Sequence, residues 1–220
     1  MQHVVFDAYG TLLDVHGAMR AQRAVLPPDW EAISAEWRQK QLEYTWVRSL
    51  TGPGHHRTFW AVTEDALAYV CARHRITDPA VRRALANSYR ALPAYPEVPG
   101  ALHAVRARGW TAAVLSNGDP DLLDDGLRSA GLRDGLDAVI SAEEAGVFKP
   151  DPRVYALVTA RFGCAPGDVA FVSANPWDTQ AAASFGFRCI RVNRSGAPDE
   201  YDLRGRALEV EDLSGLADKL

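Results

Sequence analysis

Short apolar segments recur along the chain, and helix-length stretches separate most of them. Five of these segments are four or five residues long and end in polar or turn residues, a pattern typical of buried strands. They cover residues 3–7, 111–115, 138–141, 169–173 and 188–192. Four helix-length stretches follow residue 99, over 100–108, 121–130, 152–162 and 176–185. Because strands that alternate with helices pair in parallel through right-handed crossovers, we expect an α/β fold whose sheet is covered on both faces.

The starts of three of these helices carry the same local signal. Asp119-Pro120, Asp151-Pro152 and Asn175-Pro176 each place a polar side chain before a proline. A carboxylate or amide oxygen at this position accepts a hydrogen bond from a free amide of the first turn, and proline is tolerated there. The sequence therefore predicts that all three polar side chains cap their own helices.

One long segment interrupts the alternation of strands and helices. Between residues 14 and 98 no convincing strand occurs, although the pattern predicts helices at about 30–49, 58–75 and 80–91. We expect a Rossmann-like core formed by residues 1–13 and 98–220, with residues 14–97 inserted as a helical cap subdomain after the first strand. Since ligands of such sheets bind beyond the carboxyl ends of the strands, the insert is placed to close over them. The alternative is an added scaffold without such a role.

Composition limits the classes of function. The 220 residues are 47% hydrophobic and 24% charged, as in ordinary globular proteins, and 24 basic against 28 acidic residues give a formal charge of −4. We expect no nucleic-acid partner, because the chain has no basic excess to hold a phosphate backbone. Apolar runs are too short to span a membrane, and the start MQHVVFDAYG lacks the basic region of a signal peptide. Three widely spaced cysteines form no disulfide framework, so a reducing cytoplasm is expected.

Chemically useful side chains gather where the predicted strands end. The four clusters are Asp7 with Thr11, Ser116 with Asn117, Lys149 with Tyr155, and Ser173 with Asn175 and Asp178. Each cluster alone has a plain structural explanation. In the order given, these are an acid in a turn, a favourable turn sequence, a solvated loop lysine with a core tyrosine, and a capping box at a helix start. Together they converge on one edge of one sheet, which indicates a site.

In this order, with a helical insert after the first, the four clusters resemble the haloacid dehalogenase superfamily. The segments that carry the resemblance are FDAYGTL, ISAEWRQKQLEYTWVRSL in the insert, LSNG, KPDPRVY, FVSANPWD and IRVNRSG. At this level of detail the chain is similar to the L-2-haloacid dehalogenases, the S-specific type. The resemblance implies hydrolysis of (S)-2-haloalkanoic acids to (R)-2-hydroxy acids and halide, without a cofactor, by a homodimer.

The chemistry of dehalogenation suits these residue types. A carbon–halogen centre needs an ionised nucleophile and a group that holds the departing halide. Asp7 is a ready carboxylate at neutral pH, because an unperturbed aspartate has a pKa near ~3.9. We expect it to attack C2 from behind, so that an ester forms and the carbon is inverted. The halide would leave toward Arg38 of the insert, a permanently charged planar donor. The alternative is that Arg38 is a surface helix arginine without this role.

The resemblance assigns the remaining roles. It places Asn117 and Trp177 beside the halide, and Ser116, the backbone around Ala8 and Tyr9, and Lys149 beside the substrate carboxylate. Asp178 would activate the water that hydrolyses the ester, supported by Thr11, Tyr155, Ser173 and Asn175. Leu42 and Phe59 are candidate apolar walls, although any amphipathic helix supplies such residues.

Two rival functions remain. Phosphatases of the superfamily carry a second aspartate where this chain has Tyr9, and an acidic Gly-Asp pair where it has Ser173-Ala174. Mg²⁺ usually takes one or two carboxylates, so with neither extra acid we expect a site without metal. The other rival is a non-catalytic binding protein, since a fold alone never proves an activity.

Overall fold

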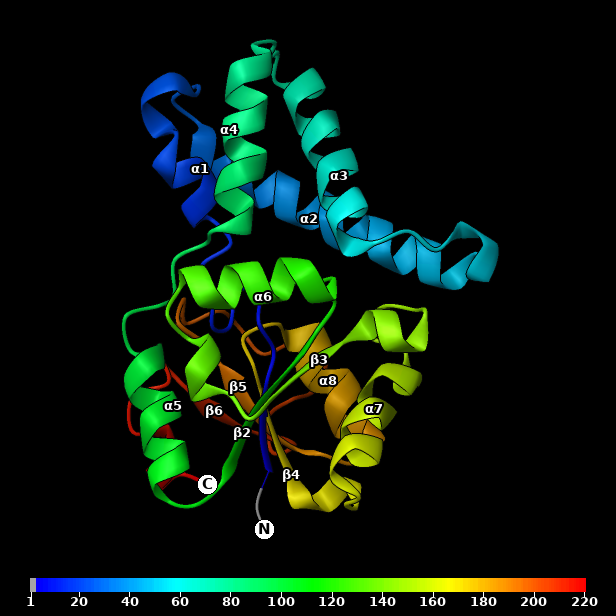
Figure 1. Cartoon of the computed structure of the whole chain (residues 1–220), viewed down its shortest axis with the longest axis vertical. Coiled ribbons are helices and arrows are strands. Elements are labelled where there is room, and N and C mark those ends of the chain that lie inside the picture. Colours follow the sequence, from blue (N-terminus) through cyan, green and yellow to red (C-terminus); the bar gives the residue numbers. More distant parts are fainter. Residues whose placement is uncertain (1–2) are drawn as a thin grey trace.

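Strands of the core form one parallel sheet. The computed structural model describes residues 3–220, and within them six strands pair in the order β3-β2-β1-β4-β5-β6 (Figure 1). The strands are β1 (His3–Phe6), β2 (Thr111–Ser116), β3 (Ala138–Ser141), β4 (Val169–Ser173), β5 (Arg188–Val192) and β6 (Ala207–Val210). Five of them lie where the apolar segments predict them. The sixth was missed because β6 is a four-residue edge strand with two exposed positions, so no buried run marks it.

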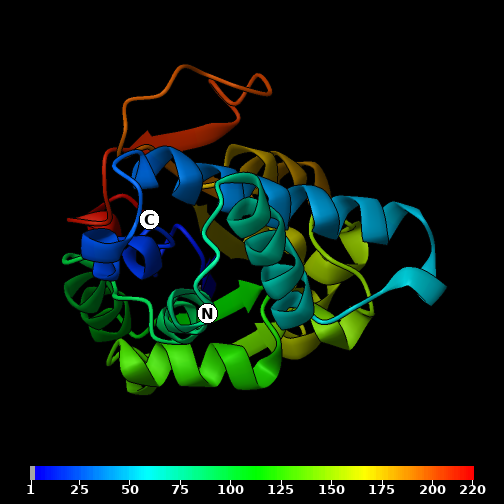
Figure 2. The same ribbon diagram turned by 90° about the horizontal axis from the view of Figure 1, so that it is seen from above.

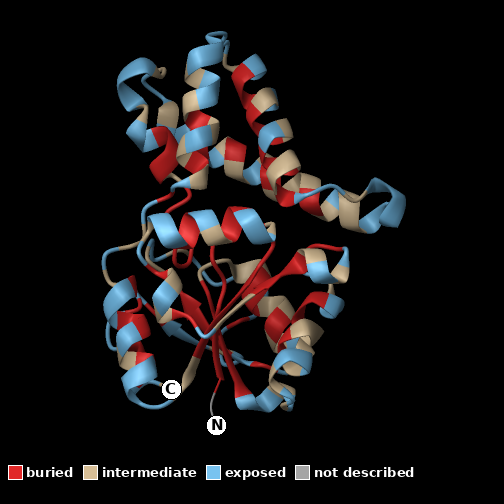
Figure 3. Cartoon of the chain, in the orientation of Figure 1, coloured by how far each residue is buried: buried red, intermediate tan, exposed pale blue. Residues whose placement is uncertain are grey.

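Both faces of the sheet are buried, as expected of parallel strands joined by helices. Val4 and Phe6 of β1 pack into one apolar cluster with residues of α5 (Val98–Ala107) and α6 (Pro120–Ser129). Val5, which points the other way, packs with residues of α7 (Pro152–Phe162) and α8 (Pro176–Phe185). Figure 3 shows the result as a buried sheet between exposed helix faces. The predicted fold class is confirmed.

A helical insert joins β1 to α5. Its helices are α1 (Gly17–Ala21), α2 (Trp30–Leu50), α3 (Phe59–Arg73) and α4 (Pro79–Arg90). The three longer ones begin and end within two residues of the predicted bounds, whereas α1 is too short to produce a periodic pattern and was missed. The insert lies over the carboxyl ends of the strands (Figures 1 and 2). Its bounds at residues 14 and 97 stay a prediction.

Short 3-10 turns complete the chain. They are η1 (Arg23–Val25), η2 (Pro53–His55), η3 (Arg133–Gly135), η4 (Ala142–Ala145), η5 (Pro166–Asp168) and η6 (Leu216–Asp218). No helix in residues 3–220 is long and apolar enough to cross a membrane.

The strand order determines where a ligand can bind. From β1 the chain winds to β2 and β3 on one side, and then to β4, β5 and β6 on the other. Because the direction reverses between β1 and β4, a crevice opens beyond the carboxyl ends of these two strands. Asp7 follows β1 directly, and Ser173 is the last residue of β4. The fold therefore brings the first and the last predicted cluster together.

Only one of the three predicted helix caps is confirmed. The Asp151 side chain accepts a hydrogen bond from the amide of Arg153 at 2.9 Å, at the start of α7. The Asp119 prediction is wrong, since its two carboxylate oxygens accept from the amides of Phe59 and Trp60, each at 2.8 Å. These amides begin α3 in the insert, and such first-turn amides have no partner within their own helix. The fold brings them to Asp119, which the local sequence could not reveal.

Candidate active site

Three donors hold the carboxylate of Asp7. Its Oδ2 accepts hydrogen bonds from Thr11 Oγ1 at 2.9 Å and from Asn175 Nδ2 at 2.8 Å. Its Oδ1 accepts from Lys149 Nζ at 3.1 Å. The Asp7 amide donates to Val172 O of β4 at 2.9 Å, which continues the parallel pairing past the end of β1. Asp7 is therefore buried and oriented, with one oxygen more fully bonded than the other.

A tight turn after Asp7 brings Thr11 back to it. The Ala8 carbonyl accepts from the amides of Leu12 and Leu13, each at 2.9 Å. Gly10 has a φ of 88°, a left-handed backbone conformation that glycine adopts without steric cost. The Thr11 hydroxyl donates to Asp7 and accepts from the amide of Ala174 at 2.9 Å, so it links the loops after β1 and β4.

Lys149 lies between two carboxylates. Its Nζ is 3.1 Å from Asp7 Oδ1 and 2.8 Å from Asp178 Oδ2, and its side chain is 1% exposed. Burial alone would lower the pKa of Lys149, but the charges of Asp178 and Asp7 and their hydrogen bonds outweigh burial and raise the pKa above its ordinary value of 10.5. The buried ammonium is therefore charged at neutral pH, and Lys149 is not a solvated loop lysine.

The second acid, Asp178, is fully buried and bonded through both oxygens. Its Oδ1 accepts from the Tyr155 hydroxyl at 2.6 Å, and its Oδ2 accepts from Ser173 Oγ at 3.2 Å and from Lys149. Burial raises the pKa of Asp178 above 3.8, the Lys149 charge opposes this shift, and the Asp7 charge adds to it. Asp178 is therefore a stronger base than an exposed aspartate.

Tyr155 is both a core aromatic residue and a donor to the site. Its ring packs edge-on to Phe171 at 5.9 Å between centroids. Burial, followed by the Asp178 charge, raises the pKa of Tyr155 well above 10.0, so the hydroxyl stays neutral and donates.

The Asn175 prediction as a helix cap is wrong. No side-chain capping bond forms at the start of α8; instead Nδ2 donates to Asp7 Oδ2 and to the Tyr9 carbonyl at 3.1 Å. The Asn175 amide donates to Ser173 Oγ at 3.1 Å. With Asp178 bonded to Lys149 as well, the capping-box explanation for this cluster no longer holds.

The Ser116-Asn117 cluster meets the Lys149 loop. Asn117 Oδ1 accepts from the backbone amide of Lys149 at 2.8 Å. Ser116 is fully buried, and its Oγ accepts from the Gly118 amide at 3.2 Å. The strand order places β2 beside β1, so this turn lies next to the Asp7 loop.

Arg38 reaches from the insert to the core. Its Nη2 donates to the Tyr9 carbonyl at 3.2 Å, and its Nη1 donates to Gln41 Oε1 at 2.7 Å. It also lines a pocket of about 410 Å³ that includes Gly10 and Asn175. Arg38 is therefore not a free surface arginine, and it lies beside the backbone that orients Asp7.

Aromatic side chains line the boundary between insert and core. The ring of Phe59 on α3 is buried, and its centroid lies 5.2 Å from that of the Tyr9 ring. Trp177 of α8 packs edge-on to Trp46 of α2, with 5.6 Å between the ring centroids. Leu42 is half-buried one turn after Arg38 on α2. Its assignment as an apolar wall stays a prediction.

Three residues with clear contacts to this region were not predicted as residues of the site. Gln41 bonds to Arg38, Asp119 bonds to the start of α3, and Arg194 donates to the carbonyls of Gly10 and Thr11 at 3.2 and 3.0 Å. For Gln41 a signal existed, because residues three apart on a helix face the same way and Arg38 had been singled out.

The residues of the site do not fit a magnesium ion. Among residues 3–220 no group of three His, Cys, Asp or Glu side chains is placed to hold a metal. The space between the Asp7 and Asp178 carboxylates is bridged by the Lys149 ammonium, which offers only donors. Tyr9 and Ser173-Ala174 add no further carboxylate to the site.

An aspartate after β1, a second acid after β4 and a lysine between them are the arrangement expected of the haloacid dehalogenase superfamily. A sequence model of the haloacid dehalogenase-like hydrolases matches residues 1–186. The chain therefore belongs to the family of haloacid dehalogenase-like hydrolases, as its motifs predict.

Known relatives extend over nearly the whole chain. (S)-2-haloacid dehalogenase 4A of Burkholderia cepacia is 39% identical over 213 residues, which are 96% of this chain and 91% of the relative. A dehalogenase crystal structure with an intermediate complex has a TM-score of 0.96 and 38% identity, covering 100% of this chain and 97% of that one. L-2-haloacid dehalogenase of Xanthobacter autotrophicus with chloropropionic acid covalently bound has a TM-score of 0.88 and 37% identity, covering 99% and 97%.

Proposed function

We propose that the protein is an (S)-2-haloacid dehalogenase that hydrolyses (S)-2-haloalkanoic acids to (R)-2-hydroxy acids and halide. The observation that carries this proposal is the buried Asp7 carboxylate, oriented by three donors and linked by Lys149 to Asp178. Relatives named (S)-2-haloacid dehalogenase, such as the Burkholderia cepacia protein, support it.

In the first step, Asp7 displaces the halogen. Oδ2 accepts two hydrogen bonds and Oδ1 accepts one, so we assign the attack on C2 to Oδ1. The new C2–O bond forms opposite the breaking carbon–halogen bond, which inverts C2 and leaves an ester. The halide carries away the bond's electron pair toward Arg38, with Asn117 and Trp177 beside it, where positive charge and donors stabilise it.

Binding of the substrate carboxylate fixes which face of C2 meets Asp7. We assign this group to Ser116, to the backbone around Ala8 and Tyr9, and to Lys149. The rest of the substrate is apolar, and we assign Phe59 and Leu42 of the insert as the walls beside it.

In the second step, water attacks Cγ of Asp7. Asp178 takes a proton from the water, and its raised pKa makes it a better base than an exposed aspartate. Negative charge then develops on Oδ2, where Thr11 Oγ1 and Asn175 Nδ2 already donate. The Cγ–O bond to the substrate breaks, and the leaving oxygen takes the proton held by Asp178. Asp7 keeps one oxygen from water, and the second proton of that water is released to solvent. Tyr155 and Ser173 hold Asp178 in place throughout.

The protein acts, in this proposal, as a cytoplasmic homodimer without a cofactor. The homodimer rests on the family resemblance, supported by exposed apolar side chains on α2, where Val47 is 52% and Leu50 is 86% exposed. The cytoplasmic location rests on the cysteines, since Cys71, Cys164 and Cys189 are all free within the described residues. We keep residues 14–97 as the cap subdomain and residues 1–13 and 98–220 as the core.

The test is halide release from the two enantiomers of 2-chloropropionate in the presence of EDTA. We expect release from the S enantiomer only, unchanged by EDTA, with Asp7→Asn as the inactive control. Phosphate release from p-nitrophenyl phosphate that requires Mg²⁺ would instead support a phosphatase. A folded protein inactive in both assays would support the non-catalytic alternative.

A further inference from the structure

A network of hydrogen bonds within the insert connects Arg38 to the buried side chains of Gln41, Thr63 and Tyr89. Gln41 is 1% exposed, and its Oε1 accepts from Arg38 Nη1 at 2.7 Å. Its Nε2 donates to Thr63 Oγ1 at 2.6 Å, and the Tyr89 hydroxyl lies 2.9 Å from Nε2 and 3.2 Å from Oε1. A buried amide with several partners of this kind is held in one orientation.

Thr63 determines which way the Gln41 amide faces. Its hydroxyl hydrogen is used on the Phe59 carbonyl, one turn earlier on α3, at 2.7 Å. Thr63 Oγ1 must therefore accept from Gln41, which turns the amide nitrogen toward α3 and the amide oxygen toward Arg38. The oxygen that meets the guanidinium is thus fixed by a chain of hydrogen bonds that starts at the α3 backbone.

The guanidinium of Arg38 is consequently held from two sides. Gln41 bonds to Nη1 from the insert, and the Tyr9 carbonyl bonds to Nη2 from the core. The same Tyr9 carbonyl accepts from Asn175 Nδ2, which also bonds to Asp7. This chain of contacts fixes where Arg38 lies relative to the nucleophile.

We propose that Gln41 is a positioning residue that holds Arg38 where the halide departs; this inference rests on the proposed dehalogenase function. An arginine side chain carries about 2 kcal/mol of rotamer entropy, so a fixed acceptor lowers the cost of presenting its remaining N–H groups. The neutral amide oxygen of Gln41 holds the guanidinium without cancelling its positive charge. A carboxylate in its place would form an ion pair with Arg38 and weaken the electrostatic stabilisation of the halide.

The consequence is a dependence on the leaving group. Chloride is a poorer leaving group than bromide, so its departure draws more on stabilisation by Arg38. A displaced Arg38 should therefore slow carbon–chlorine cleavage more than carbon–bromine cleavage, while a general loss of folding would slow both equally. Misplacement of a catalytic group by about 1 Å can cost up to ~100-fold in rate.

The experiment measures single-turnover release of chloride and bromide from (S)-2-chloropropionate and (S)-2-bromopropionate. Halide release reports the first step only, so slow ester hydrolysis cannot mask the effect. For Gln41→Met we expect a fall of about tenfold or more for chloride and a smaller fall for bromide. Thr63→Val, which keeps Gln41 but removes its orienting partner, should change the bromide-to-chloride ratio in the same direction by less.

Gln180 provides a matched control. It also accepts from an arginine, Arg206 Nη1 at 2.8 Å, but on the exposed side of α8. Gln180→Met should leave both rates unchanged, and thermal unfolding of each variant reports its folding.

Equal losses for both halides in Gln41→Met, or none, would overturn the positioning role. A Gln41→Glu variant that releases chloride as fast as wild type would also overturn it, because the neutral amide would then be unnecessary. If the wild-type protein releases neither halide, the proposed function is wrong and this inference is wrong with it. If the wild-type protein releases both halides, the variants test the positioning role of Gln41 alone.

Discussion

Lys149 allows two acids to lie in one buried site. Asp7 and Asp178 would otherwise suppress each other's ionisation, because like charges in a buried site repel strongly. The ammonium, 3.1 and 2.8 Å from their oxygens, offsets both charges. Removing one partner from such a buried group leaves an uncompensated charge, so we expect an apolar side chain in place of Lys149 to destabilise the site.

Asp178→Asn should separate the two chemical steps. The variant keeps an oxygen that can accept from Tyr155 but cannot take a proton from water, so we expect one equivalent of halide and then an accumulated ester. Rapid quenching, halide titration and mass spectrometry of the Asp7 peptide measure both products. Asp121→Asn, an exposed acid in the first turn of α6, should turn over normally. If Asp178→Asn gives no halide burst, the assigned role of Asp178 is wrong.

The raised pKa of Asp178 predicts the acid limb of ester hydrolysis. Asp178 must be ionised to accept a proton, so hydrolysis should decline with falling pH at a value above 3.8, the ordinary pKa of aspartate. The contribution of Asp178 to stability changes with pH in the opposite direction. Folded Asp178 binds its proton more tightly than the unfolded chain does, so protonation of Asp178 stabilises the fold. The stabilisation is fully present below pH 3.8 and is lost as the pH rises through the folded pKa.

Single-turnover hydrolysis of the preformed ester, measured from pH 3 to pH 8, tests this pH dependence. An acid limb at or below 3.8 would contradict the raised pKa. On the alkaline side Lys149 should stay charged beyond pH 10.5, so its stabilisation is lost only as the pH rises through that higher folded pKa.

At the scale of elements, Asp119 joins α3 to the core. Its carboxylate accepts hydrogen bonds from the amides of Phe59 and Trp60, so Phe59, which we propose as a wall residue, is positioned by a loop that follows β2. The interaction combines a capping bond with a contact between insert and core. We therefore expect it to affect both the stability of the helix and the position of the Phe59 ring beside Tyr9.

Asp119→Ala should lower stability and weaken substrate binding. Loss of a helix cap costs roughly 0.5–2 kcal/mol, and each kcal/mol lowers Tm by about 2–4 °C in a chain of this length. Asp151→Ala is the matched control, since Asp151 caps α7 within the core. We expect both variants to lose Tm but only Asp119→Ala to raise KM for (S)-2-chloropropionate. An unchanged KM would limit Asp119 to a structural role.

Local sequence patterns predict the interior of this fold better than its contacts across elements. The buried strands and the long helices α2, α3 and α4 have clear periodicity, whereas the edge strand β6 and the five-residue α1 have none. Residues at strand ends, such as Asp7, are predictable because parallel strands end at one edge.

Side chains whose partners are distant in sequence were wrongly assigned as helix caps or were missed. Asp119 and Asn175 look like caps of the helices they precede, yet their partners come from α3 and from the β1 loop. Gln41 belongs to no recognisable motif, and its role becomes visible only through its hydrogen bonds with Arg38 and Thr63. The hydrogen-bond partner of such a side chain depends on which distant segments pack against it, and the neighbouring sequence carries no information about that packing.

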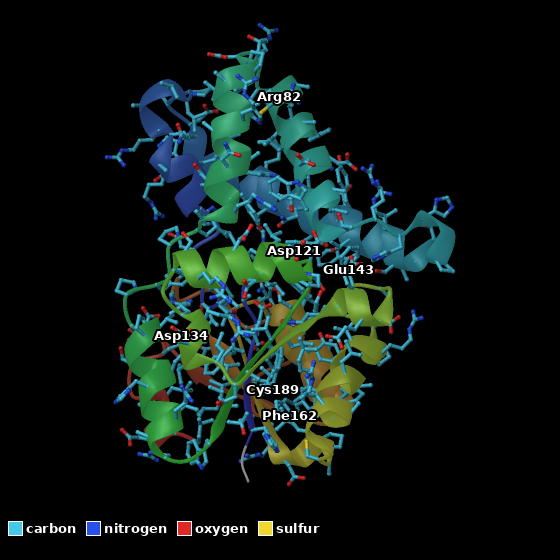
Figure 4. The ribbon with its side chains drawn as sticks, in the orientation of Figure 1. Arg82, Asp121, Asp134, Glu143, Phe162 and Cys189 are labelled. Atoms are coloured by element: carbon cyan, nitrogen blue, oxygen red, sulfur yellow. The ribbon has the colours of Figure 1, made fainter. Side chains whose placement is uncertain are left out.

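At the scale of the whole molecule, insert and core are linked by several polar contacts around the site. Ser49 Oγ of α2 accepts from the Phe148 amide at 3.2 Å, and His56 Nε2 lies 3.0 Å from Glu143 Oε1. Figure 4 labels Glu143 at this edge of the core, below α2. With the Arg38–Tyr9 contact, these links hold the insert over the carboxyl ends of the strands.

One turnover in water enriched in oxygen-18 shows whether an ester forms on Asp7 and is cleaved at Cγ. Enzyme in excess over (S)-2-chloropropionate, followed by mass spectrometry of the Asp7 peptide and of the product, locates the heavy oxygen. An ester on Asp7 should leave the label in the Asp7 carboxylate and give unlabelled hydroxy acid in this first turnover. Label in the hydroxy acid, with none in the protein, would contradict it, because water would then have attacked C2 directly.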